Sequence, residues 1–210
     1  MRLQVIRLTL LLLTCVALSA HAEPLARPGD MLLRHDIRLL VDEGVINLPM
    51  NTWPIPWADV FDQLNRAAIA ELSPELAGAM ARLRERARWE LDTGEWYLTG
   101  WASVAAEPRV IRTFEDTPRE EAEAGLAFSW TGNRFTLNLS AAYANDPVDG
   151  EEFRPDDTYV GMVLGNWMVT AGWQQRWWGP GNDASSILSS NARPRPGVTL
   201  QRNLSTPFET

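Results

Sequence analysis

One short segment of this 210-residue chain gathers the side chains that could do chemistry. Residues 173–183 read WQQRWWGPGND, with three tryptophans within six residues, followed by Gly-Pro-Gly and Asn-Asp. Such a segment could belong to a hydrophobic core, to a catalytic loop, or to a surface that binds something flat and polar. The third interpretation is chemically specific, because indole rings offer flat apolar faces while Gln, Arg, Asn and Asp form hydrogen bonds.

Few residues are available for catalysis or metal binding. Residues 1–22 combine two arginines, an apolar run and a final Ala-His-Ala, which predicts a secretory signal peptide cleaved after Ala22. That segment contains the only cysteine, Cys15, and leaves His35 as the only histidine of the mature chain. The mature chain therefore has no thiol nucleophile, and one histidine is too few for most serine–histidine triads and His/Cys metal sites to be assembled. We expect no enzyme activity, no catalytic residue, no cofactor and no metal site.

The charge of the chain argues against nucleic acid as a partner. The formal net charge is -8, and it becomes -10 without residues 1–22, which hold two arginines and no acid. Many carboxylates fall in two segments, 108–120 and 145–157. These could form a Ca²⁺ site, but their spacing matches no calcium loop, and they could supply a pair of glycosidase-type carboxylates, but any acidic loop offers such pairs. We therefore expect solvated acidic loops.

Two types of element must position these side chains, and the first is helical. Between residues 30 and 92 apolar residues recur every three or four positions. They form three stripes: Leu33, Ile37, Leu40 and Val41; Trp57, Val60, Phe61, Leu64 and Ala68; and Leu76, Met80, Leu83, Ala87 and Leu91. Ser73-Pro74-Glu75 is typical of a capped helix start. We expect a small α-helical module over 23–93.

After Gly94 the apolar period changes to two, which predicts β-strands. One hairpin is expected over 126–143 around a turn at 131–133, and another over 160–173 around the turn at 165–166. Further strands are expected at 95–107 and 197–203. In each hairpin one face is apolar and the other is small and polar.

A soluble sandwich would also alternate, but three features favour a membrane barrel. Aromatic residues lie at the ends of the apolar faces, short turns alternate with long loops, and a signal peptide is present without a spanning helix. A strand from Trp167 to Trp177, tilted by about 40°, would cover roughly 25 Å of membrane height. We therefore expect a mainly β protein, in which 94–210 forms the N-terminal part of an outer-membrane antiparallel β-barrel after a periplasmic helical module. Trp173 and Trp177 would face lipid, and Gln174, Arg176 and Trp178 the lumen.

Two segments carry a family resemblance. LRHDIRLLVDEGVINLPMNTWPIPWADV at 33–60 and GWQQRWWGPGNDASSILSSNARPRPGVTLQR at 172–202 resemble the capsule assembly protein Wzi family of Gram-negative bacteria. The resemblance implies an outer-membrane β-barrel, with a helical bundle at its periplasmic end, that acts as a lectin holding capsular or extracellular polysaccharide at the cell surface. It also implies outer-membrane lipid as a partner. A periplasmic helical face of this kind would be well placed to contact polysaccharide-export machinery, a contact that the sequence leaves open. Family members are much longer and close their barrels, so we expect this chain to be a fragment or a truncated reading frame.

A lectin of this kind needs aromatic faces for sugar rings and polar groups for hydroxyls and carboxylates. The residues that fit are Gln174, Arg176, Trp178, Asn182, Asp183, Arg193 and Arg195. Local positive charge is expected there, because four arginines face only two acids from residue 166 onward. A carbohydrate-permeable channel is the alternative function, and a barrel enzyme ranks last because the serines at 185–190 lack a histidine partner.

Overall fold

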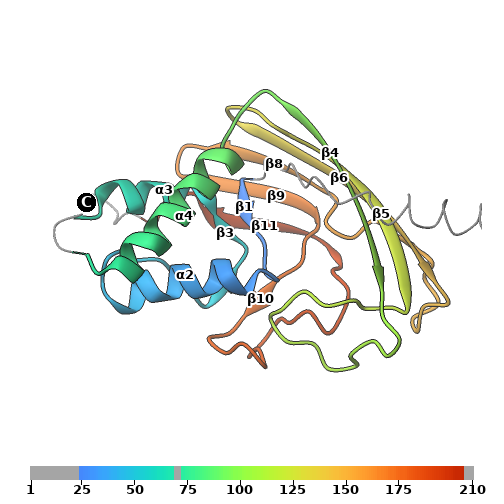
Figure 1. Cartoon of the computed structure of the whole chain (residues 1–210). Coiled ribbons are helices and arrows are strands. Elements are labelled where there is room, and N and C mark those ends of the chain that lie inside the picture. Colours follow the sequence, from blue (N-terminus) through green and yellow to red (C-terminus); the bar gives the residue numbers. More distant parts are fainter. Residues whose placement is uncertain (1–23, 69–71, 206–210) are drawn as a thin grey trace, which may run out of the picture.

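A computed structural model describes residues 24–68 and 72–205, so the predicted signal peptide lies outside the described residues. Helices gather at one side of the molecule and a curved antiparallel sheet forms the other (Figure 1). Mainly β architecture is therefore confirmed, and the path of the sheet has two ends rather than closing on itself.

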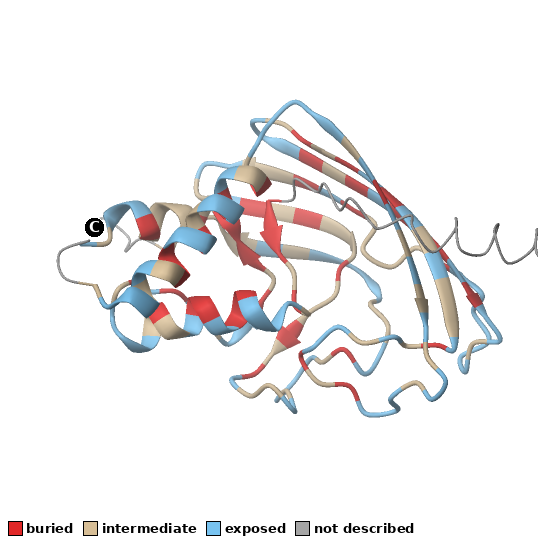
Figure 2. Cartoon of the chain, viewed as in Figure 1, coloured by how far each residue is buried: buried red, intermediate tan, exposed pale blue. Residues whose placement is uncertain are grey.

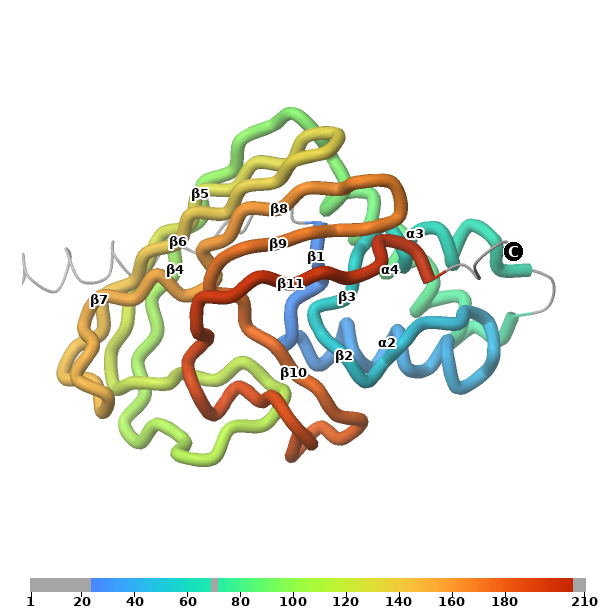
Figure 3. Tube along the Cα trace, turned by 180° about the vertical axis from the view of Figure 1, so that it is seen from behind, coloured from blue at the N-terminus to red at the C-terminus, as the bar shows by residue number. Residues whose placement is uncertain are grey.

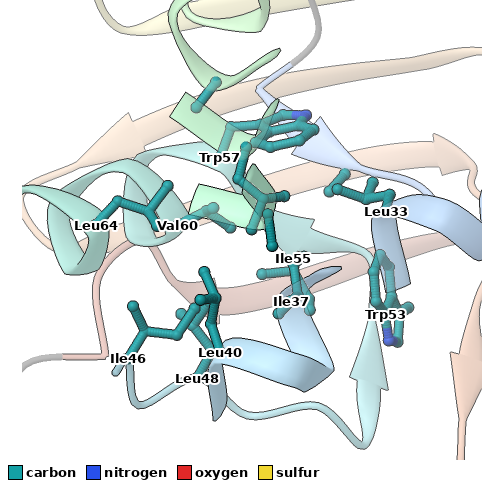
Figure 4. Close-up of a cluster of buried hydrophobic side chains, with 14 of the residues drawn as sticks. Leu33, Ile37, Leu40, Ile46, Leu48, Trp53, Ile55, Trp57, Val60 and Leu64 are labelled. Carbon is teal, nitrogen blue, oxygen red and sulfur yellow. The ribbon is translucent and has the colours of Figure 1, made fainter. Parts of the chain in front are cut away.

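The three predicted helices are present. They are α2 (Met31–Asp42), α3 (Trp57–Arg66) and α4 (Pro74–Glu90). Asp30 caps α2 by accepting a hydrogen bond from Leu33 N, and Ser73 caps α4 by accepting one from Leu76 N. Their apolar stripes meet in a core that includes the residues labelled in Figure 4. Two short antiparallel strands also belong here, β1 (Leu25–Ala26) and β3 (Ile55–Pro56).

The main sheet has the strand order β11-β9-β8-β6-β5-β4, and each neighbouring pair is antiparallel. Its strands are β4 (Trp96–Val104), β5 (Ala122–Thr131), β6 (Phe135–Asn145), β8 (Tyr159–Leu164), β9 (Trp167–Trp173) and β11 (Pro196–Arg202). A two-residue strand, β7 (Phe153–Arg154), pairs with β6 within the second long loop. Both predicted hairpins and both single strands are confirmed.

Burial along the sheet is the reverse of that in a soluble protein. Buried and exposed residues alternate along β5 and β6 (Figure 2). The apolar side chains are on the outer face, where Leu126 is 59% exposed, whereas Asn138 on the opposite face is 1% exposed. Thr99, Ser129, Thr136, Ser140 and Thr170 are also buried on this inner face. Such polarity suits a sheet whose outer surface meets hydrocarbon.

The inner face of the sheet is covered by the N-terminal segment and by long loops. Leu25 of β1 packs against Tyr159 and Met168 of the sheet. Seen from behind, β1 lies beside β8 and β9, and the loops before β5 and after β10 curve below the strands (Figure 3). The helices, the N-terminal segment and the sheet therefore enclose one shared interior.

Candidate functional site

The tryptophan-rich segment leaves the main sheet instead of extending it. Strand β9 ends at Trp173, and the next strand, β10 (Trp177–Trp178), pairs with β2 (Thr52–Trp53) in the helical region. At Gly172 the backbone has φ 148°, and a Cβ there would lie 2.2 Å from Thr158 O. The prediction of one strand from Trp167 to Trp177 is wrong. The chain leaves the sheet after Trp173, next to the close approach of Gly172 to Thr158, and the alternation of side chains between the two faces cannot be extrapolated beyond that point.

Trp177 lies in a protein core rather than against lipid. Its side chain is 0% exposed and packs edge-on against Phe114, with ring centroids 5.7 Å apart. Phe114 in turn packs edge-on against Trp53, at 5.0 Å. The prediction that Trp177 faces lipid is wrong, because the helical region supplies both a pairing strand and aromatic partners for it.

Arg34 of α2 holds the Gly-Pro-Gly turn in place. Its Nη2 donates to the carbonyl oxygens of Gly179, Pro180 and Gly181, at 3.3, 3.0 and 2.9 Å. Its guanidinium carbon lies 4.1 Å from the centroid of the Phe114 ring, a cation–π contact. Burial, reinforced by the charge of Arg38, lowers the pKa of Arg34 to about 10, which leaves it protonated at neutral pH. We call Arg34 and the three carbonyls the arginine clamp.

Both glycines of the turn are required by close packing. A Cβ at Gly179 would lie 2.8 Å from Ser186 N, and a Cβ at Gly181 would lie 2.9 Å from Ala184 O. Trp177 Nε1 also donates to Gly181 O, at 3.0 Å. The motif therefore anchors the end of a strand to the helices. Sequence reasoning missed this role for Arg34, although its segment and the tryptophan segment both carry the family resemblance.

The seven predicted binding residues do not form one cluster. Gln174 is buried and accepts from Thr170 Oγ1 at 2.6 Å, while Arg176 Nη2 donates to Thr199 Oγ1 at 2.6 Å. Trp178 is in β10, so the prediction of its lumenal position from strand parity does not apply. In the described part of the chain, none of the seven side chains is bonded to another. Asn182 is half-buried, and Asp183 and Arg195 are exposed.

Arg193 is neutralised by acids from the preceding long loop. It binds Asp156 through two hydrogen bonds, 2.8 and 3.0 Å long, and Asp149 through a third of 3.1 Å. These bonds raise the pKa of Arg193 despite its partial burial. The expected local positive charge at Arg193 is therefore wrong, since residues 37 and 44 positions away supply carboxylates.

Arg154 organises the two acidic loops. It is buried and forms ion pairs with Glu120 at 2.5 Å, Glu123 at 2.9 Å and Asp149 at 3.3 Å. Because Asp149 also binds Arg193, one network joins both acidic loops to the segment after β10. The expectation of solvated acidic loops is wrong for these residues, since each binds a guanidinium.

A cavity of about 580 Å³ lies on the inner side of the sheet. Its walls are the inner face of β4 to β6, the N-terminal segment 25–30, the C-terminal half of α4 and the loop 112–119. The lining combines one half-buried indole, Trp101, with serine and threonine hydroxyls, the Gln175 amide and several guanidiniums and carboxylates. None of the seven predicted residues lines it, although Gln175 and Pro194 are direct neighbours of four of them.

Between 24–68 and 72–205, no three histidine, cysteine or acidic side chains are placed to hold a metal ion together. Over the same ranges, no helix has both the length and the apolar character to cross a membrane.

Comparisons with known proteins point to one family. The family model for capsule assembly protein Wzi matches residues 100–210. An uncharacterized 55.8 kDa protein in the cps region of Klebsiella pneumoniae is 28% identical over 199 residues, which cover 94% of this chain and 38% of that protein. A solved structure of Wzi, described as an outer membrane protein involved in group 1 capsule assembly in Escherichia coli and as a carbohydrate-binding β-barrel, matches with a TM-score of 0.73 and 26% identity. The match covers 89% of this chain and 41% of that one, so the chain spans about two fifths of the length of these relatives.

Proposed function

The chain belongs to the Wzi family of capsule assembly proteins, and from that membership we propose that it attaches capsular or extracellular polysaccharide to the cell surface as part of an outer-membrane β-barrel. Its mode of action is binding. No catalytic residue is proposed, because polysaccharide attachment by a lectin requires neither a nucleophile nor an acid–base pair.

The observation that carries the proposal is the reversed polarity of the sheet. Large apolar side chains cover the outer face, and small, polar or hydrogen-bonded side chains cover the inner face. In water such an arrangement would expose an apolar patch with no compensation, whereas in a bilayer the same patch replaces lipid–lipid contacts. Polar ligands could then reach the cavity that remains on the inner side of the sheet.

Aromatic residues support a membrane boundary at the short-turn end of the sheet. On β4, Trp96 stacks on Phe128 and Trp130 of β5, with centroids 4.7 and 5.5 Å apart. Tryptophans gather at the interface between lipid and water because the ring is apolar and the N–H is polar. We place this end and the helices toward the periplasm, after signal cleavage at Ala22, where the helices could meet export machinery. The long loops would then face outside.

A channel for carbohydrate is less well supported. A channel needs an open polar path, but Leu25 packs on the inner face of β8 and β9, and the N-terminal segment 25–30 and residues of the loop 112–119 form walls on the same side. Conductance in planar bilayers without polysaccharide retention by cells would favour the channel.

Loss of the gene should test the proposed function directly. In a strain without it, we expect polysaccharide still to be made but to appear in the medium instead of on the cells, and a plasmid copy should restore the cell-bound share. The measurement is uronic acid or total sugar in cell and medium fractions. An unchanged cell-bound share would refute the proposal.

A further inference from the structure

We propose that the cavity on the inner side of the sheet binds an acidic sugar unit of the polysaccharide, with Trp101 as the stacking surface and Arg119 and Arg112 as the source of positive charge. The inference rests on the proposed function and names the site and the ligand class. It assigns binding to residues other than those of the tryptophan-rich segment.

Trp101 is held flat against the wall of the cavity. In the β4–β5 ladder it is paired with Gly125, and a Cβ on Gly125 would lie 2.3 Å from the Cζ2 atom of the indole. Two more ring atoms lie within 2.8 Å of the same position. The ring therefore occupies the space that any other residue at 125 would fill. Because Trp101 is half-buried and lines the cavity, it offers a preformed flat surface to the C–H face of a sugar ring.

Five guanidiniums and six carboxylates line the cavity, and the guanidiniums differ in how closely they are paired with acids. Arg27 binds Asp157, Arg86 binds Glu90, and Arg154 binds Glu123, at 3.0, 2.6 and 2.9 Å. These three guanidiniums of the lining are thereby paired with acids that also line the cavity.

Arg112 and Arg119 are held mainly by backbone carbonyls instead. Arg119 donates to Ser190 O at 2.6 Å and Asn191 O at 2.9 Å, and Arg112 donates to Thr117 O at 2.5 Å. Among the described residues, the ion pair that involves one of these two arginines joins Arg112 to Asp116 at 3.5 Å, and the Asp116 side chain is largely exposed. Carbonyls orient a guanidinium but do not neutralise it. Burial lowers the pKa of both arginines, although Asp116, Glu120 and Glu123 near Arg112, and Asp156 and Glu120 near Arg119, act to raise it. A carboxylate on the ligand would bind these oriented guanidiniums directly.

The size and the remaining lining fit a short stretch of glycan. A volume of about 580 Å³ lies within the 300–1,000 Å³ range of ordinary small-ligand sites. Ser103, Ser140 and Gln175 add donors and acceptors for hydroxyls. Together with the indole and two oriented guanidiniums, these groups match an acidic pyranose better than a neutral apolar ligand.

The test uses the protein purified from outer membranes in detergent and the surface polysaccharide of the cells that make it. The polysaccharide is compared before and after chemical reduction of its carboxyl groups, with affinity measured by isothermal titration. Loss of ring stacking in Trp101→Ala should weaken binding about tenfold. Arg119→Gln should weaken binding of the acidic form roughly 10- to 100-fold and leave the reduced form little changed.

Two further variants separate binding from folding. Gly125→Ala keeps the indole but displaces it, so it should weaken binding as Trp101→Ala does. Trp96→Ala removes an indole from the outer face of the same strand and should leave affinity unchanged. If the unaltered protein binds polysaccharide but Trp101→Ala and Arg119→Gln bind equally well, the cavity assignment fails and the proposed function stands. Equal affinity for the reduced form would overturn the acidic ligand, and no binding by the unaltered protein would overturn both.

Discussion

Substitution of Arg34 by leucine tests the arginine clamp. The change removes the donor to three carbonyls and the cation above Phe114. All three carbonyls lose this charged donor, but Gly181 O keeps its bond from Trp177 Nε1, so only those of Gly179 and Pro180 lose it without a remaining side-chain donor among the described residues. Each carbonyl left unsatisfied costs about 1–3 kcal/mol, and the lost cation–π contact adds about 1 kcal/mol. Release of a buried guanidinium from its desolvation offsets part of this, so we expect a net loss of about 2–4 kcal/mol.

The loss of stability in Arg34→Leu should be confined to the loop around the Gly-Pro-Gly turn, and amide hydrogen exchange can measure it. The amides of Trp178 and Gly179 donate to Leu188 O at 2.8 Å and Asn51 O at 2.9 Å, so they report opening of the clamped loop. A loss of about 2–4 kcal/mol should speed their exchange roughly 30- to 1,000-fold. Exchange in the β5–β6 hairpin should not change.

Arg38→Leu is the matched control for this prediction. Arg38 lies one turn further along α2, is half exposed, and forms a 3.6 Å surface pair with Asp42. Such a pair is worth about 0–1 kcal/mol, so exchange near the Gly-Pro-Gly turn should stay as in the unaltered protein. Unchanged exchange of Trp178 and Gly179 in Arg34→Leu, or an equal effect of both variants, would refute the clamp.

Three other changes have clear expected outcomes. Trp177→Ala should destabilise the helical core by about 3–5 kcal/mol in denaturant unfolding, because it empties a fully buried indole site; a loss below about 1 kcal/mol would contradict burial. Arg154→Met should leave the buried Glu120 without its partner, costing about 3–5 kcal/mol, and should expose the long loops to protease. Burial acts to raise the pKa of Asp149, but its bonds from Glu151 N and Arg193 and the nearby arginines lower it overall. Its folded pKa is therefore below its unfolded value of 3.8, so its stabilisation is present above about pH 4 and is lost as pH falls further. Loop proteolysis by an acid-active protease should rise in that range, and Asp149→Asn should remove this part of the pH dependence.

The sheet was predictable because its information is local. Side chains two positions apart share a face, so the outer stripe of Leu126 and Phe128 and the turn after Thr131 could be predicted from short windows. The helix start at Ser73 was predictable for the same reason, since capping involves residues three positions apart.

The site was not predictable, because its contacts join distant positions. Arg34 and Gly179 are separated by 145 residues, and Arg193 and Asp149 by 44. A window around Arg193 contains a surplus of arginine, but the fold supplies the balancing acids from another loop. Trp177 shows the same limit. Alternation predicts a face only while a strand stays in its sheet, and a glycine within a strand, such as Gly172, does not by itself show that the chain leaves after Trp173.

The core of the helical region implies an order of assembly. Phe114 follows the first strand of the sheet and Trp177 follows its fifth, yet both are buried among the helices. Loop closure over such separations is slow, and its entropy must be recovered by contacts that form late. The helical core is therefore complete only when the chain through β9 has joined it, so final packing of the helices reports that the first five strands are in place.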